Sequence, residues 1–411
     1  MLAAKGRLGT GSLPRVPKVR EVLRIMPVAA IYGGNAGGKS NMVRALQALK
    51  KIVTKGVIPV FPFRLDDVSP TAPTVFSICV VASGETWEYE ISVRDQKVET
   101  EKLSIIVQGK PKDVFVRKSE QFSMGILPGA SKNDMAAMQS IGNAIQPDVP
   151  FVFFASKLKT VSNGISPFCN WFAKTLCIIP AGARRKALSM DLFTNRISYG
   201  TALAQADTGV SGLECKEIKE IDLESLHISQ EDREKMLAAA DDQAFILGED
   251  TVVMKKNGNF YKYQALFQHM KTNGEAEQFR LSEESDGTQR LMHLLPVVLD
   301  RRKHAPEVFV VDELDRSLHT ELSRALVERH LESALDPNTG TCRQLIFTTH
   351  DVMLIDPQLM SVDSMWAVER MEDGASRLFS FVEFKEAAKD RHLRRSYMEG
   401  RMGGVPSLSL L

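Results

Sequence analysis

The sequence lacks the features that would place the chain in a membrane or an oxidising compartment. No apolar run approaches the roughly 18–20 residues of a spanning helix, and no apolar stretch near the N-terminus has signal-peptide length. The five cysteines are scattered and show neither CxxC nor Cys/His metal spacing. These absences predict reduced thiols in a cytoplasmic protein that does not engage a membrane.

Charge of one sign is also missing. The 52 basic and 51 acidic side chains leave a formal net charge of +1. This balance provides no global attraction to nucleic acid or to a membrane, and any such attraction would have to come from a local patch.

The remaining composition is that of a large globular protein. Hydrophobic residues make up 44% and charged residues 25% of 411 positions, enough for two or more lobes. We expect a first lobe over 1–127, a compact and mostly helical insertion with a short hairpin over 128–275, a second lobe over 276–385, and a C-terminal segment over 386–411.

Periodicity predicts several regular elements. Alternating apolar residues favour a hairpin over 74–93, and Asn257-Gly258 favours another. The other segments expected to be regular are strands over Val22–Tyr32, Val308–Val311 and Gln344–Thr349, and helices over Ser40–Val53, Glu321–Leu335 and from Ser229. Short buried strands alternating with helices predict an α/β fold with a mainly parallel core sheet.

One glycine-rich turn carries a chemical signal. Gly33–Ser40 fits GxxxxGK[ST], between an apolar stretch and an amphipathic stretch. In such a loop, backbone N–H groups surround phosphates, the lysine reaches the β- and γ-phosphates, and the serine hydroxyl binds Mg²⁺. The turn therefore predicts ATP and Mg²⁺ as ligands. The expected nucleotide-contacting residues are Gly33, Asn35, Gly37, Gly38, Lys39, Ser40 and Asn41.

Two further strands end in polar side chains. Val308–Val311 leads into Asp312, expected to hold Mg²⁺ with Ser40, and Glu313, expected to be the general base for water. Gln344–Thr349 leads into His350, expected to hydrogen-bond the γ-phosphate and the lytic water. Acids after a strand also act as helix caps, and a lone His there is often structural. The accompanying P-loop favours the catalytic interpretation.

A fourth motif precedes the acidic strand. Ser285 and Gly287 are expected to open a helix whose N-terminus faces a phosphate. By itself this pattern predicts only a helix cap. Its position in the order of the other motifs favours a role at the nucleotide site.

The order of these motifs resembles the ABC-type ATPase head of the repair and chromosome-maintenance ATPases and the OLD-type nucleases. More narrowly, it resembles the AAA15 group. The phrases that carry the resemblance are Ile31–Asn41, Glu284–Arg290, Asp312–His319, Thr348–Asp351 and Tyr397–Pro406. It implies an ABC-type P-loop head with an antiparallel β subdomain, a mainly parallel core sheet and a compact helical insertion.

The same resemblance implies a homo-oligomer in which two heads enclose ATP. Ser285 and Gly287 of one subunit would contact the γ-phosphate held by Lys39 of the other, and Ser317–His319 would lie along the seam. Relatives carry a Phe-Arg-Ser-Phe strand pair before the P-loop that helps contact adenine, whereas this sequence begins close to the P-loop. Adenine contacts are then either reduced or supplied by another segment.

Three functions follow from this resemblance. The first is an ATPase sensor or scaffold of a bacterial abortive-infection system such as PARIS, which holds a separate effector nuclease until a phage-encoded trigger releases it. The alternative is a DNA-repair or recombination ATPase, for which 389–395 offers some positive charge, although a solvated helix face or a subunit contact is the favoured explanation of that charge. A transporter subunit is disfavoured because its signature normally reads LSGGQ.

Overall fold

The computed structural model describes residues 26–158, 162–181, 192, 195–226, 228–241, 244–247, 251–299, 308–334, 343–384, 387, 390 and 392–405. The chain divides into two compact units. The first comprises 1–178, 302–313 and 331–411, and the second comprises 179–301 and 314–330.

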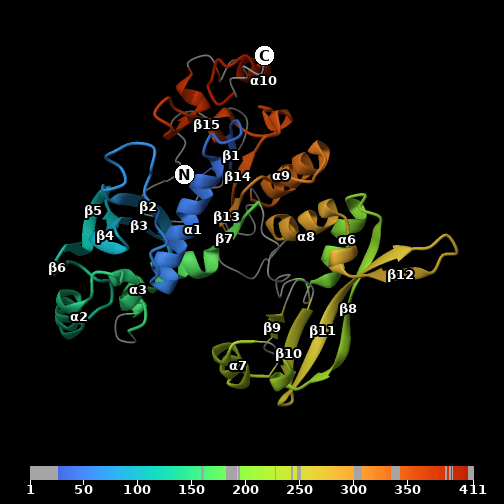
Figure 1. The fold of residues 1–411 in the computed structure, drawn as a ribbon, viewed down its shortest axis with the longest axis horizontal. Coiled ribbons are helices and arrows are strands. Elements are labelled where there is room, and N and C mark those ends of the chain that lie inside the picture. Colours follow the sequence, from blue (N-terminus) through green and yellow to red (C-terminus); the bar gives the residue numbers. More distant parts are fainter. Residues whose placement is uncertain are drawn as a thin grey trace. The chain divides into compact units, whose positions relative to one another are not determined.

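The first unit is built on a mixed sheet with the strand order β16-β15-β1-β14-β13-β7 (Figure 1). Its strands are β1 (Val28–Tyr32), β7 (Leu176–Ile179), β13 (Val308–Val311), β14 (Gln344–Thr349), β15 (Met365–Arg370) and β16 (Ser376–Ser380). β1 pairs in parallel with β14 and β15, and β13 pairs in parallel with β14. The mainly parallel core sheet is thereby confirmed. Residues 22–25 of the expected first strand lie outside the described residues.

Helix α1 (Lys39–Lys55) follows the glycine-rich turn. It begins after Gly38 and ends at Gly56, both in left-handed conformations that glycine adopts without steric cost. Leu49, Ile52 and Val53 are buried at the i, i+3, i+4 spacing of one helix face. The predicted helix over Ser40–Val53 is confirmed, as is the one over Glu321–Leu335, which forms α9 (Thr320–Ala334).

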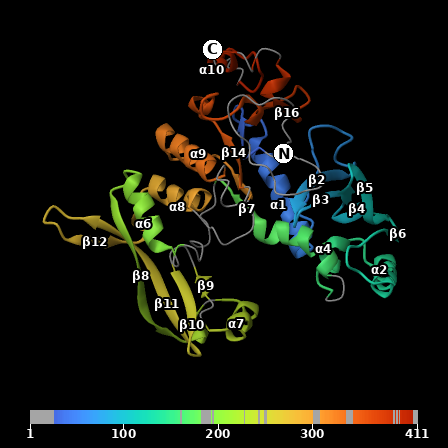
Figure 2. The same ribbon diagram turned by 180° about the vertical axis from the view of Figure 1, so that it is seen from behind.

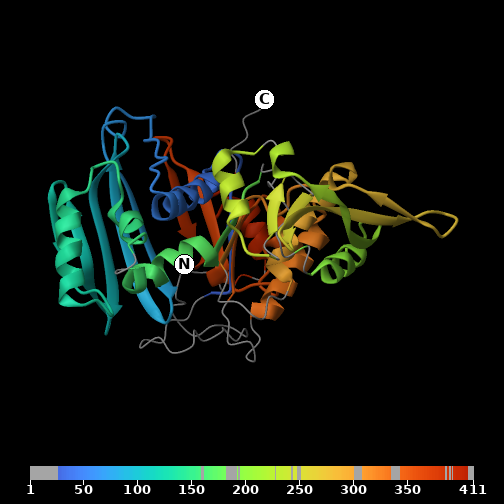
Figure 3. The same cartoon turned by 90° about the horizontal axis from the view of Figure 1, so that it is seen from below.

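An antiparallel sheet of order β2-β3-β4-β5-β6 completes the first unit, with α2 alongside it (Figure 3). The elements are β2 (Thr74–Ala82), β3 (Glu85–Arg94), β4 (Lys97–Val107), β5 (Lys110–Lys118), β6 (Gln121–Met124), α2 (Lys132–Ala144), α3 (Phe151–Ala155) and α4 (Ser162–Asn170). Ser83 and Gly84 both have positive φ, as a tight hairpin turn requires. The predicted hairpin over 74–93 is confirmed.

The second unit contains another antiparallel sheet, and the β11–β12 hairpin projects away from α6 (Figure 2). Its elements are α6 (Arg196–Gln205), β8 (Val210–Ile221), α7 (Gln230–Leu237), β9 (Ala244–Leu247), β10 (Thr251–Lys256), β11 (Asn259–Met270), β12 (Ala276–Phe279) and α8 (Asp286–Val298), with the first part of α9. The Asn257-Gly258 hairpin and the cap at Ser229 are confirmed.

The expectation of a mostly helical insertion is wrong for its second half. β8 pairs with β11 over its whole length, and β9 and β10 extend the same sheet. The pairing shifts register opposite Ile218 and Ser211. Such bulges interrupt the strict two-residue alternation of a strand. The apolar residues of β8 recur at about three-residue spacing instead, a pattern that resembles that of a helix.

Across the described part of the chain, no helix combines the length and apolarity needed to cross a membrane.

Candidate functional site

The glycine-rich turn folds into a closed loop between β1 and α1. The Gly37 amide donates to the Gly34 carbonyl at 3.3 Å, and the Asn41 amide donates to the Gly38 carbonyl at 3.0 Å. Gly38 and Ala36 have φ values of 108° and 60°. The loop tip, including Asn35, is exposed, so the predicted loop forms with its tip open to solvent.

Glycine is required in this loop because backbone and side-chain atoms of another segment lie close behind it. A Cβ on Gly33 would lie 2.5 Å from the carbonyl oxygen of Val368 in β15. A Cβ on Gly38 would lie 2.0 Å from the Ser376 hydroxyl in β16. The β15–β16 hairpin therefore backs the loop, and a larger side chain at either glycine would displace it.

The ammonium group of Lys39 is held inside the loop. Lys39 is 6% exposed, and its Nζ donates to the carbonyls of Gly33 at 2.6 Å and Gly34 at 3.0 Å. Its Nζ also lies 3.3 Å from His350 Nδ1. An ammonium only donates, so a hydrogen bond between the two uses Nδ1 as the acceptor and the Nε2 tautomer of the ring. That leaves an N–H donor on the other side of the His350 ring.

The acidic strand and the serine of the loop meet next to Lys39. The Ser40 hydroxyl donates to Asp312 Oδ1 at 3.2 Å. A hydroxyl and a carboxylate side by side are oxygen ligands of the kind that Mg²⁺ takes, so these two residues fit the expected metal. The predicted pairing of Ser40 with Asp312 thus exists in the fold.

Thr348 is a member of this cluster that the sequence did not single out. Its hydroxyl donates to Asp312 Oδ1 at 2.7 Å and accepts from the Glu313 amide at 2.8 Å. Thr348 is 1% exposed. The sequence feature that could have identified Thr348 is its position as a polar residue near the end of a buried strand, next to the strand that ends in the two acids.

Glu313 has a left-handed backbone, with φ 52°. A non-glycine residue in that conformation costs on the order of 1 kcal/mol and is common at functional sites. The Thr348 hydroxyl holds its amide in place. Asn41 lies on the exposed first turn of α1, where its Oδ1 accepts from Arg44 at 3.2 Å.

Ser285 and Gly287 lie in the second unit, at the start of α8. The Ser285 hydroxyl accepts from the Thr288 amide at 3.2 Å and caps the helix. A Cβ on Gly287 would lie 2.9 Å from the carbonyl of Ser317, which itself has φ 59°. The expected signature and seam residues are therefore in contact with one another within this unit.

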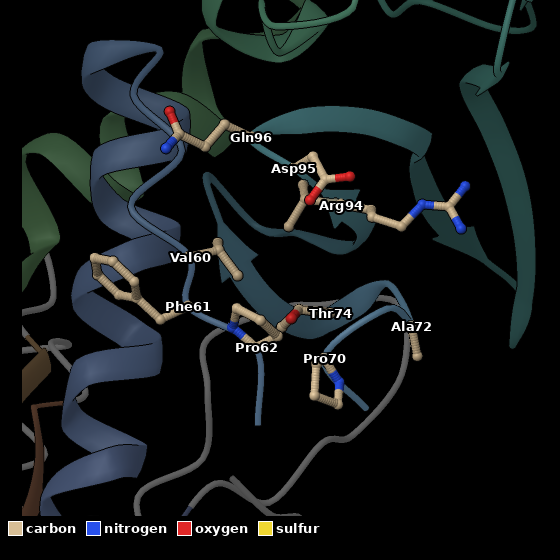
Figure 4. A pocket seen from close by; sticks show the side chains of 10 residues that line it. Val60, Phe61, Pro62, Pro70, Ala72, Thr74, Arg94, Asp95 and Gln96 are labelled. Atoms are coloured by element: carbon tan, nitrogen blue, oxygen red, sulfur yellow. The ribbon is translucent and has the colours of Figure 1, made fainter. Parts of the chain in front are cut away.

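A separate hollow of about 380 Å³ lies in the first unit between the chain that follows α1 and the turn joining β3 to β4 (Figure 4). It is lined by Val60, Phe61, Pro62, Pro70, Ala72, Thr74, Val93, Arg94, Asp95 and Gln96. None of the expected nucleotide-contacting residues lines it, so the hollow is not part of the candidate site.

A mainly parallel sheet, a glycine-rich loop closed around a lysine, and a serine–aspartate pair beside it define the P-loop ATPase class. The chain belongs to the AAA domain family described as a putative AbiEii toxin of a type IV toxin–antitoxin system, whose model matches residues 28–172 and 180–356. No curated protein sequence matches the chain significantly.

Two solved structures resemble the fold at low sequence identity. The SMC head domain from Thermotoga maritima is 16% identical with a TM-score of 0.33, covering 85% of this chain and 89% of its own. An SMC head bound to the C-terminal winged-helix domain of ScpA is 14% identical with a TM-score of 0.38, covering 87% and 91%.

Proposed function

We propose that the chain binds ATP with Mg²⁺ at Gly33–Ser40 and hydrolyses it. The observation that carries the proposal is the position of Lys39 Nζ on the carbonyls of Gly33 and Gly34, directly beside the linked Ser40 and Asp312. A lysine held in this way presents its charge to a nucleotide's β- and γ-phosphates.

Each side chain of the cluster has a role in this proposal. Ser40 and Asp312 would hold Mg²⁺, which when bound neutralises phosphate charge. Glu313 accepts a proton from the attacking water. The Nε2–H of His350 donates to the γ-phosphate or to that water. His350 contacts Lys39 through Nδ1, so Nε2 stays available for this bond.

We further infer that hydrolysis requires two heads. Ser285 and Asp286 are exposed at the start of α8, and the first amides of a helix together with its dipole attract an anion. Ser285 and Gly287 of one subunit would then contact the γ-phosphate bound by a second copy, which makes the homo-oligomer the active species.

For the biological role we propose an antiviral sensor or scaffold that holds a separate effector nuclease until a phage-encoded trigger releases it. The description of the family as a putative toxin of a toxin–antitoxin system supports a conditional system of this kind.

Prediction: Lys39→Ala abolishes ATP binding, whereas Glu313→Gln retains ATP and lowers turnover by at least about 100-fold, within the range of general-base contributions. Binding is measured by calorimetry and turnover by phosphate release. Lys51→Ala, an exposed lysine on the same helix, is the matched control and keeps both activities. Wild-type turnover by Glu313→Gln contradicts the general-base role.

The proposed biological role is tested by co-purification with the products of neighbouring genes. A nuclease recovered as a stable complex supports the scaffold role. Recovery of the chain bound to DNA instead, with affinity that falls steeply with salt, contradicts it.

A further inference from the structure

The segment that follows α10 (Leu393–Met398) returns to the P-loop from the far end of the sequence. The Gly34 amide donates to the carbonyl of Gly404 at 2.8 Å, across 370 positions of the chain. The same carbonyl accepts from the hydroxyl of Tyr397 at 3.1 Å. One backbone oxygen thus joins the C-terminal segment to the nucleotide loop.

The peptide between Gly33 and Gly34 is held at both ends. Its N–H donates to Gly404, and its carbonyl, that of Gly33, accepts from Lys39 Nζ at 2.6 Å. A peptide unit is planar, so fixing the direction of the N–H also fixes the direction of the carbonyl. The Gly404 carbonyl therefore sets the orientation of the group that anchors Lys39.

Tyr397 is built to hold this carbonyl. It is 4% exposed, and its ring packs at 5.7 Å from that of Phe381 and 6.1 Å from that of Tyr32, the residue just before Gly33. Burial raises the pKa of the Tyr397 phenol to about 12, so it remains a protonated donor.

Gly404 is equally constrained. Its φ is 73°, and a Cβ there would lie 3.2 Å from the Ala367 Cβ and 3.3 Å from the Tyr397 hydroxyl. The conformation that directs its carbonyl at Gly34 is therefore open to glycine and strained for other residues.

We propose that Tyr397 and Gly404 are positioning residues for Lys39, acting through the Gly33–Gly34 peptide. The inference rests on the proposed nucleotide site. By this inference the C-terminal segment contributes to ATP binding through the backbone of the loop.

The experiment measures the ATP dissociation constant of the full chain by calorimetry and its melting temperature without nucleotide. Tyr397→Phe keeps the ring and removes only the hydroxyl, and we expect ATP to bind about three- to tenfold more weakly. Gly404→Ala weakens binding at least as much. If Gly404→Ala does not fold, Tyr397→Phe decides the question alone.

Matched controls separate positioning from loss of stability. Tyr89→Phe removes another buried tyrosine hydroxyl, one that donates to Glu101 at 3.0 Å. Gly400→Ala strains a glycine of the same segment, φ 77°, whose Cβ would meet nothing within 4 Å. Both controls should bind ATP as the wild type does.

The inference is overturned if Tyr397→Phe and Gly404→Ala bind ATP with wild-type affinity, even with a lowered melting temperature. The C-terminal segment would then contribute to the stability of the fold and not to ATP binding. An equal loss of affinity in the Tyr89→Phe control overturns it as well. If Lys39→Ala binds ATP normally, the proposed nucleotide site is wrong. If Lys39→Ala loses ATP binding while Tyr397→Phe and Gly404→Ala keep it, only the positioning role is rejected.

Discussion

At the scale of single residues, the Thr348 hydroxyl connects the two acidic residues of the candidate site. It donates to Asp312 and accepts from the Glu313 amide. Asp312 is thereby oriented toward Ser40, and the left-handed backbone of Glu313 is supported. A hydrogen bond to a buried carboxylate is worth about 1.5–3 kcal/mol.

Prediction: Thr348→Val, which keeps the shape and removes the hydroxyl, lowers ATP turnover at least about tenfold while ATP binding persists. Turnover is measured by phosphate release at saturating ATP. Ser104→Ala serves as the control, since its hydroxyl also bonds a carboxylate, that of Asp113 at 2.9 Å, outside the candidate site. Unchanged turnover in Thr348→Val would show that Asp312 and Glu313 keep their positions without it.

The sequence predicted Lys39 and Ser40 from the local P-loop pattern, and Asp312 and His350 because their strand ends accompany that loop. The structure brings these four together. Thr348 could not be assigned in the same way, since threonine near the end of a buried strand is ordinary and its partners lie on another strand.

At the scale of elements, a buried carboxylate joins the antiparallel sheet of the first unit to helix α3. Glu101 of β4 is 0% exposed and accepts from the amides of Phe151 at 2.7 Å and Val152 at 2.9 Å. The helix has Pro150 at its N-cap and no side-chain cap of its own. Glu101 therefore caps α3 from a distant strand.

Burial raises the pKa of the Glu101 carboxyl, although the two amides, Tyr89 and Arg117 act in the opposite direction. Arg117 lies at 4.0 Å from this carboxyl and is 3% exposed. Its guanidinium also donates to the carbonyls of Val149 at 2.8 Å and Gln146 at 2.9 Å.

Prediction: Glu101→Ala lowers the free energy of unfolding by about 3–5 kcal/mol, because it removes the carboxylate beside a buried guanidinium and leaves two helix amides without their acceptor. Denaturant unfolding measures the change. The control is Glu90→Ala on the exposed face of β3, which we expect to stay within about 0.5 kcal/mol of the wild type. A similar small effect at Glu101 would mean that water replaces the lost acceptor.

At the scale of the whole molecule, the two compact units are not consecutive stretches of chain. The candidate P-loop, Asp312 and His350 belong to the first unit, whereas Ser285, Gly287 and Ser317 belong to the second. We expect a shared site between subunits to need both sets of residues.

Prediction: Ser285→Arg spares ATP binding by the single chain but abolishes turnover that depends on assembly, since the added side chain fills the space expected for the γ-phosphate. The rate per chain is measured against protein concentration. Ser229→Arg is the matched control, because Ser229 also caps a helix of the second unit through the amide of Asp232 at 3.1 Å. Loss of one cap costs only about 1 kcal/mol.

If Ser285→Arg hydrolyses ATP at the wild-type rate at every concentration, the shared-site proposal is wrong. Equal loss in the Ser229→Arg control would attribute the effect to the helix cap.

The sequence by itself determined the local parts of this protein: the P-loop with its helix, the hairpins at Ser83-Gly84 and Asn257-Gly258, and the strands ending at Asp312 and His350. These follow from turn chemistry and periodicity over a few neighbouring residues. Only the tertiary structure decided the bulged pairing of β8, the hydroxyl of Thr348 between two acids, and the return of Gly404 to Gly34. Those contacts join residues that are distant in the chain, and their geometry depends on how the sheets pair and pack.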